Sequence, residues 1–233
     1  MAKVAPRRKR RAPRRDTNWL LLGGIGLVGV VGLFALLFMT LQGEGAPTPV
    51  PETELAEFCT TNEENCVAKG NPEAPVTVVE VSDYGCPHCR NFNLEGTAAT
   101  LDDLYVKAGQ VRWVVVPFAL RSTTEPAAAA ALCAAEQDQF FPFHHYMFEI
   151  QDTDAALSRA GFVQGAEALD MDVDAFEDCL NSGRYRSVVQ RNIAAARSAG
   201  VTGTPAFFVN GARLEGNQPL SSFQEEIERA LGS

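Results

Sequence analysis

The sequence has few histidines. It contains three histidines and six cysteines in 233 residues. His144 and His145 are adjacent, and no histidine follows them at the four-residue spacing that places two ligands on one helix face. A zinc site built on a Cys-x-x-Cys pair would need two further ligands at matched spacing, which the other cysteines do not supply. We therefore expect no metal, and we expect no other cofactor.

Charge is missing from one long stretch. From Trp19 to Leu41 the chain has 23 residues without Asp, Glu, Lys or Arg, a length that covers about 34 Å as a helix. This pattern predicts one N-terminal transmembrane helix at residues 19–41. A cleaved signal peptide is the alternative, but the stretch is longer than the apolar part of a signal peptide, and no clear small-x-small cleavage site follows it.

Positive charge is scarce after the first 18 residues. Residues 1–18 carry eight Lys or Arg against one Asp, whereas the remainder carries twelve against twenty-eight Asp or Glu. By the positive-inside rule, residues 1–18 should be a basic cytoplasmic segment and everything after Leu41 should be extracytoplasmic. Nucleic-acid binding by the basic segment is the alternative. Because the adjacent membrane segment already explains the charge, we expect no nucleic-acid partner.

The rest of the chain divides into a linker and one domain. Residues 42–57 include a stretch rich in Gly, Pro and Thr without apolar periodicity, which predicts a linker. Residues 58–233 are long enough to form one domain with a sizeable core. All six cysteines follow the membrane segment, where an oxidising compartment favours disulfides.

The apolar patterns of this domain predict an α/β fold. β-Branched residues at 76–81 indicate a buried central strand, residues 89–107 have helical spacing, and residues 111–118 indicate a second strand parallel to the first. Only helical patterns occur in the insertion at about 122–199. Strand patterns resume at 206–209 and 212–215 around Asn210-Gly211, a strong hairpin signal, and a helix is expected at 220–231.

Cys86-Pro87-His88-Cys89 follows the first strand and a short turn. A cysteine delivered to the first turn of a helix places its sulfur near unpaired backbone N–H groups, where a thiolate is stabilised. Two cysteines at this spacing can alternate between dithiol and disulfide. The same spacing also builds half of a zinc site.

Four features together resemble the thioredoxin superfamily, and its DsbA branch in particular. They are the CPHC sequence after a strand, Glu80 six residues before the first cysteine, the helical insertion, and Gly203-Thr204-Pro205 before a hairpin. The resemblance covers about residues 58–233 and implies a thioredoxin-like fold with a helical insertion. The N-terminal membrane segment is similar to that of membrane-anchored bacterial DsbA-like proteins.

The resemblance implies a role for each motif residue. Cys86 would be the nucleophile and Cys89 its buried partner. Pro87 and His88 belong to the motif, and His88 would add a polar or cationic contact to the thiolate or else be a passive exposed side chain. Glu80 would be a proton relay near Cys89 or else an edge-strand residue facing water. Thr204 and Pro205 would form the substrate-binding loop with a cis peptide bond, or else an ordinary trans turn.

The remaining cysteines predict two structural disulfides. Cys133 and Cys179 lie on predicted helices of the insertion, so a bridge between them would join two helices. Cys59 and Cys66 could close a local loop near the start of the domain. Free or intermolecular thiols are the alternative for each pair, and six cysteines permit fifteen complete pairings.

The sequence thus predicts an extracytoplasmic thiol–disulfide oxidoreductase that donates its Cys86–Cys89 disulfide to reduced, unfolded secreted proteins. Such an enzyme ends reduced, so it would need a membrane reoxidase resembling DsbB or a vitamin K epoxide reductase homologue. A disulfide reductase or isomerase is the first alternative, because it would use the same residues. A copper or zinc carrier with a thioredoxin fold is the second.

Overall fold

The structure is a computed structural model, which describes residues 54–61 and 64–232. The chain divides into two compact units, Met1–Thr48 and Pro49–Ser233, and the described residues belong to the second. The predicted basic segment at 1–18, the membrane helix at 19–41 and residues 42–53 of the predicted linker at 42–57 lie outside the described residues. Within the described part, no helix combines the length and apolar character needed to cross a membrane.

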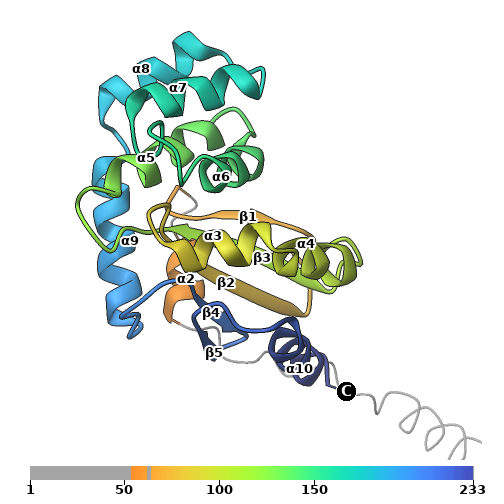
Figure 1. Ribbon diagram of the computed structural model, residues 1–233. Helices are drawn as coiled ribbons and strands as arrows, with labels where there is room; N and C mark the ends of the chain where they lie inside the picture. Colours follow the sequence, from red (N-terminus) through yellow and green to blue (C-terminus); the bar gives the residue numbers. More distant parts are fainter. Residues whose placement is uncertain (1–53, 62–63, 233) are drawn as a thin grey trace, which may run out of the picture. The chain divides into compact units, whose positions relative to one another are not determined.

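A five-stranded sheet with the order β1-β3-β2-β4-β5 forms the centre of the domain (Figure 1). β2 (Val76–Ser82) and β3 (Val111–Pro117) are parallel, as predicted. β4 (Ala206–Val209) runs antiparallel to β2 and forms a hairpin with β5 (Ala212–Glu215). β1 (Val67–Lys69) pairs antiparallel with β3 and was not predicted. β2 therefore lies between two partners, as expected of a central strand.

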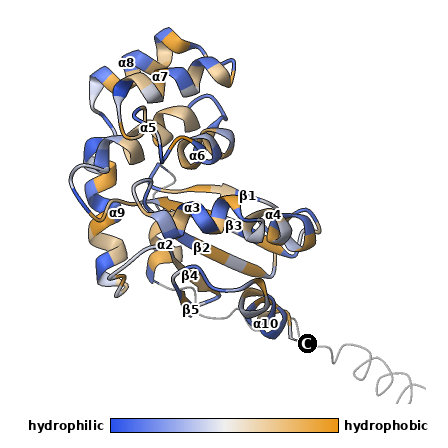
Figure 2. Cartoon of the chain, in the orientation of Figure 1, coloured by the Kyte–Doolittle hydropathy of each residue, from blue (hydrophilic) through white to orange (hydrophobic). Residues whose placement is uncertain are grey.

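The alternation of side chains along β2 divides the core into two layers. Val76 and Val78 face one layer with helices α3 (Pro87–Leu94) and α10 (Leu220–Ala230). Val79 and Val81 face the other, with α2 (Glu54–Thr61) and α9 (Arg186–Ser198). Figure 2 shows the central strands as mostly hydrophobic along their length. Because strand residues alternate with period two, Glu80 falls on the same face as Val78, under α3.

The helix that follows Cys89 is shorter than predicted. The continuous helix expected to residue 107 is wrong, because α3 ends at Leu94 and Gly96 adopts a left-handed conformation with φ of +96°. Only glycine adopts this conformation at little cost, so the chain turns here. The path continues as α4 (Thr97–Leu101) and the wider helical turn η1 (Asp102–Val106).

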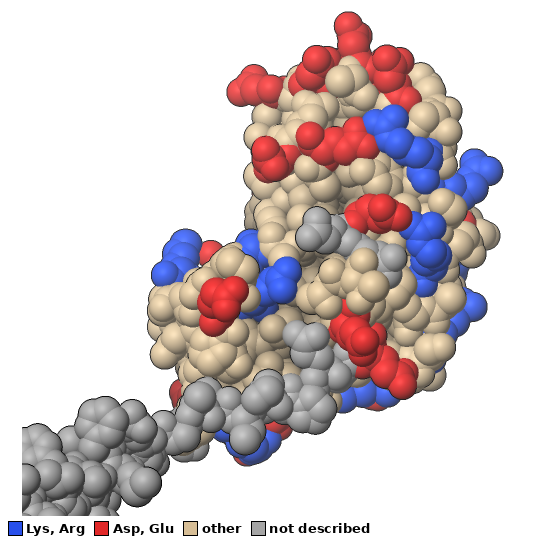
Figure 3. Space-filling model, turned by 180° about the vertical axis from the view of Figure 1, so that it is seen from behind, with Lys and Arg blue, Asp and Glu red and all other residues tan. Residues whose placement is uncertain are grey.

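The insertion is entirely helical, as predicted. It consists of α5 (Glu125–Ala135), α6 (Phe140–Glu149), α7 (Arg159–Ala168) and α8 (Val173–Ser182), and α9 leads back to the sheet. α7 was not predicted. In Figure 1 these helices gather at one side of the sheet, away from α10. On the opposite face of the molecule, acidic side chains gather over the α7–α8 end, and Lys and Arg lie along the flank that carries α9 (Figure 3).

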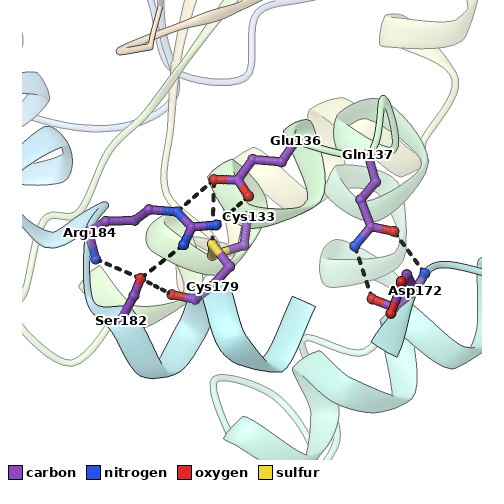
Figure 4. Close-up of a disulfide and its surroundings, with 7 residues drawn as sticks. All are labelled: Cys133, Glu136, Gln137, Asp172, Cys179, Ser182 and Arg184. Atoms are coloured by element: carbon purple, nitrogen blue, oxygen red, sulfur yellow. Dashed lines mark hydrogen bonds and ion pairs between the residues drawn. A yellow bond between two sulfur atoms is a disulfide. The ribbon is translucent and has the colours of Figure 1, made fainter. Parts of the chain in front are cut away.

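Two disulfides fasten the domain. Cys133 on α5 is bonded to Cys179 on α8, with Cα atoms 5.8 Å apart (Figure 4). Cys59 on α2 is bonded to Cys66 just before β1. Since α2 begins at Glu54 and buries Leu55, the folded domain starts inside the segment assigned to the linker.

Candidate active site

Cys86 occupies the position that starts helix α3. Its backbone is extended, with φ −95° and ψ 118°, and Pro87 follows in the first helical turn. Proline suits this position because its fixed φ fits the helix and its missing N–H is not needed there. The sulfur of Cys86 thus lies at the helix N-terminus, where free backbone N–H groups point outward.

The two cysteines of the motif have opposite acidity. Hydrogen bonds from the Cys89 thiol, the Thr204 side chain and the backbone amides of Cys89 and His88 lower the pKa of Cys86 to about 5, against the opposing effect of burial. Burial and the neighbouring Cys86 raise the pKa of Cys89 well above its usual value. Both are free thiols in the structure. At neutral pH the pair is therefore a Cys86 thiolate beside a Cys89 thiol.

The loop before β4 lies against Cys86. The Thr204–Pro205 peptide bond is cis, as expected from the resemblance. The Thr204 carbonyl oxygen is 3.2 Å from the Cys86 sulfur and accepts a hydrogen bond from the thiol when the thiol is neutral. The Thr204 hydroxyl is buried with no other hydrogen-bond partner among the described residues, and the Thr204 side chain favours the Cys86 thiolate. The motif and this loop are more than 100 residues apart in sequence, and the fold brings them together.

His88 contributes through its backbone. Its amide is among the groups that lower the pKa of Cys86, whereas its side chain is exposed. Among the described residues, the His88 side chain therefore makes no hydrogen bond or ion pair with the Cys86 sulfur, and the helix backbone fills the role expected of it.

Glu80 lies buried beneath α3 rather than at a solvent-facing edge. Its two carboxylate oxygens accept hydrogen bonds from Asn93 Nδ2 at 3.2 Å and from Trp113 Nε1 at 2.9 Å. Burial raises the pKa of Glu80, although these donors partly offset it. Asn93 Nδ2 also donates to the Cys89 carbonyl oxygen at 3.0 Å. One amide group therefore connects the buried acid to the helical turn that carries Cys89.

The turn between β2 and α3 is shaped by Asp83. Its carboxylate accepts hydrogen bonds from the backbone of Gly85 at 2.7 Å, from the backbone of Leu120 at 2.6 Å and from the Thr124 hydroxyl at 3.0 Å. A side chain at Gly85 would lie 2.5 Å from the Thr124 methyl carbon, so only glycine fits there. Asp83 thus ties the loop that presents Cys86 to the start of the insertion.

Several residues of this site were not identified from the sequence. Asn93 and Trp113 bind Glu80, while Tyr84 and His144 continue the hydrogen-bonded chain away from it. Asp83 and Tyr84 gave a local signal only as members of the short turn before the motif. His144 entered the sequence analysis solely as a possible metal ligand. Among the described residues, no three His, Cys, Asp or Glu side chains come together as a metal site.

Comparison with known proteins places this geometry in a family. The family model described as Thioredoxin matches residues 61–229. "Na(+)/H(+) antiporter NhaA 3" of Salinispora tropica is 34% identical over 173 residues, which are 71% of this chain and 24% of the antiporter. The chain thus spans about a quarter of the length of the antiporters it matches.

Two further relatives have nearly the size of this domain. "Probable disulfide bond formation protein D" of Bacillus anthracis is 27% identical over 169 residues, covering 70% of this chain and 76% of the relative. The crystal structure of oxidised BdbD from Bacillus subtilis has the same fold, with a TM-score of 0.67 and 23% identity over 74% of this chain and 96% of BdbD. The chain therefore belongs to the thioredoxin family, and it is similar to a protein named for disulfide bond formation.

Proposed function

We propose that this chain is a membrane-anchored, extracytoplasmic oxidase that donates its Cys86–Cys89 disulfide to reduced, unfolded secreted proteins. The observation that carries the proposal is the low pKa of Cys86, held at about 5 by donors from the start of α3 and from the loop of Thr204. A stable thiolate makes the reduced enzyme the favoured product, so its disulfide is a strong oxidant. The antiporters' transport activity is not part of the proposal, because the shared segment is about a quarter of those proteins.

The reaction proceeds by thiol–disulfide exchange. A substrate thiolate attacks the Cys86 sulfur, the Cys86–Cys89 bond breaks, and its electron pair leaves on Cys89, which takes a proton because burial raises its pKa. A second substrate thiolate then attacks the substrate sulfur of the mixed disulfide and releases the Cys86 thiolate. The substrate gains a disulfide, and the enzyme ends as a thiolate–thiol pair.

The proposed membrane topology and partners of the enzyme are inferred from the sequence. We place residues 1–18 in the cytoplasm, a single membrane span at 19–41 and the domain outside, where disulfides persist. A membrane reoxidase resembling DsbB or a vitamin K epoxide reductase homologue would restore the disulfide. Glu80 would relay the Cys89 proton, and the loop of Thr204 and Pro205 would pair with the extended substrate chain.

The test is oxidation of a reduced, unfolded protein by the oxidised full-length chain, combined with redox titration of the Cys86–Cys89 couple. We expect stoichiometric disulfide transfer, its loss in Cys86→Ser, and a midpoint well above that of thioredoxin. A midpoint close to thioredoxin's, about −270 mV, would instead identify the reductase or isomerase. Stoichiometric copper or zinc on the purified protein, lost in Cys86→Ser, would identify the metal carrier.

A further inference from the structure

A histidine of the insertion is buried against the redox centre. His144 on α6 is 4% exposed, and both of its ring nitrogens have a hydrogen-bond partner. Nδ1 lies 2.8 Å from the Tyr84 hydroxyl, and Nε2 lies 3.2 Å from Asn93 Oδ1. Because a buried polar side chain is costly unless its hydrogen bonds are satisfied, this arrangement fixes the ring. Through His144 the insertion therefore contacts Asn93 and lies 3.8 Å from Glu80.

The hydrogen-bond pattern determines the position of the imidazole proton. Asn93 donates through Nδ2 to Glu80 and to the Cys89 carbonyl, so its Oδ1 faces His144 as an acceptor. His144 Nε2 must then carry the hydrogen. Burial lowers the pKa of His144 to about 3, so the ring is neutral and Nδ1 accepts from the Tyr84 hydroxyl. The chain of donors runs in one direction, from Tyr84 through His144 and Asn93 to Glu80.

The packing around the ring leaves one small opening. The imidazole stacks on Phe140, with ring centroids 5.5 Å apart, and meets Phe148 edge to face at 4.9 Å. Beside it, Glu80, Asn93 and His144 line a cavity of about 30 Å³, which is large enough for a water molecule. Lys69 and Asp102 also line this cavity, and their ion pair is partly exposed. The cavity therefore offers Glu80 a short path for protons to solvent.

We propose that His144 is a positioning residue of the exchange reaction, which holds Asn93 and thereby Glu80 in the orientation that moves the Cys89 proton. In a mixed disulfide, Cys86 is bonded to the sulfur of another molecule. When the Cys89 sulfur attacks Cys86, the Cys86–Cys89 bond forms, the bond from Cys86 to the other molecule breaks, and its electron pair leaves with that molecule as a thiolate. The Cys89 proton passes to the Glu80 carboxylate and leaves through the cavity.

The charged and titratable groups around His144 come from every neighbouring element. They are Glu80 of β2, 3.8 Å from Nε2, Tyr84 after β2, Lys69 of β1, Asp102 of η1 and His145 on α6 itself. Since His144 is neutral, its contact with Glu80 is not an ion pair. If the ring is removed, Asn93 loses its fixed orientation and Glu80 loses a directed donor. Glu80 should then hold its proton to higher pH.

The test uses the full-length chain with glutathione attached to Cys86 as a mixed disulfide. The rate at which Cys89 releases the glutathione is followed from pH 5 to pH 9. In His144→Phe we expect the midpoint of the profile to rise by about one pH unit, which slows release about tenfold below the midpoint. His144→Gln keeps a donor near the Nε2 position and should recover most of the loss.

The matched control is His145→Phe, the exposed neighbour on the same helix, which should leave the profile unchanged. A folded His144→Phe with the wild-type profile would overturn the proposal. If His144→Phe does not fold, Tyr84→Phe and nitrogen NMR of wild-type His144 replace it. A proton found on Nδ1 of His144 would also overturn the proposal. The proposal rests on thiol–disulfide exchange at Cys86 and Cys89 but not on its direction. A redox titration that contradicts the oxidase function would therefore leave the role of His144 standing.

Discussion

Two of the three cysteine pairs in the molecule, the Cys133–Cys179 pair of the insertion and the Cys86–Cys89 pair of the motif, differ in their chemistry. Cys133 and Cys179 are 2% and 1% exposed, and Cys86 and Cys89 are 8% and 0% exposed. Burial therefore does not separate the structural pair from the reactive one. The insertion pair joins α5 and α8 beneath an ion pair of Glu136 and Arg184 (Figure 4). The motif pair lies on a single helical turn, and donors converge on one of its two sulfurs.

The difference lies in the distribution of hydrogen-bond donors. Cys86 receives hydrogen bonds from the start of α3, from its partner thiol and from Thr204, and these lower its pKa. The pKa of Cys89 is raised mainly by burial. One sulfur is thereby prepared to leave as a thiolate and the other to keep its proton. In the insertion pair, the sulfurs are already bonded to each other across two helices, and that bond constrains the fold.

The largest expected effect comes from removing the buried member of the reactive pair. In Cys89→Ser the Cys86–Cys89 disulfide cannot form, so oxidation of reduced substrates should fall below detection. When the variant is given a substrate that contains a disulfide, the Cys86 thiolate should attack it, and the adduct should accumulate because no internal thiol displaces the substrate. Mass spectrometry of the trapped adducts measures this. The control is Cys133→Ala with Cys179→Ala, in which adducts should not accumulate; accumulation there would break the distinction between the two pairs.

The next effect is a pH dependence of stability that belongs to the reduced protein alone. The pKa of Cys86 is lowered from about 9.0 to about 5 in the folded state. A lowered pKa contributes stability that is fully present above the unfolded value and is lost as pH falls through the folded value. The reduced protein should therefore gain stability relative to the oxidised protein between pH 5 and pH 9.

Urea unfolding of both forms across this range measures the difference. Cys86→Ser provides the control, because its stability should lack this pH dependence. Cys89 contributes little below about pH 8, because its raised pKa keeps it protonated in the folded state and an unfolded cysteine ionises only at about pH 8.5. A pH-independent difference between the two forms would show that Cys86 is not a stabilised thiolate.

A third effect concerns the insertion pair. Cys133→Ala combined with Cys179→Ala removes a bridge between positions 46 residues apart, which should lower the free energy of unfolding by about 3–4 kcal/mol. Chemical denaturation measures the loss. The pH profile of exchange at Cys86 should keep its midpoint, because His144 on α6 remains in place. A shifted midpoint would mean that the disulfide also positions the redox centre.

Sequence reasoning located the reactive pair but not the side chains that tune it. Strands 76–81 and 111–118, the hairpin at Asn210-Gly211 and the Cys86 motif were predictable because each is marked by local pattern or spacing. The His144 chain was not, because its members lie 51 and 60 residues apart and meet only through packing. Nothing in the sequence around His144 distinguishes it from exposed His145.

The missed elements have local reasons. α7 contains two glycines and shows little apolar periodicity, and β1 has only three residues. Both are defined by their neighbours: Gly165 lies where a side chain would meet Tyr146 at 2.5 Å, and β1 exists through pairing with β3. The break after α3 depended on the backbone of Gly96, and a single glycine in a helical pattern does not by itself predict a turn.

The smallest effect tests whether the far side of the insertion acts on stability alone. Asp172 caps α8, where its carboxylate accepts a hydrogen bond from the Ala175 amide at 3.0 Å. Asp172→Ala should cost about 1 kcal/mol, measured by chemical denaturation, while exposed Asp178→Ala on the same helix should cost much less. Exchange at Cys86 should remain at the wild-type rate in both. A slower rate in the cap variant alone would mean that α8 also transmits its position to the site, whereas an unchanged rate would leave α6, through His144, as the tested link between insertion and chemistry.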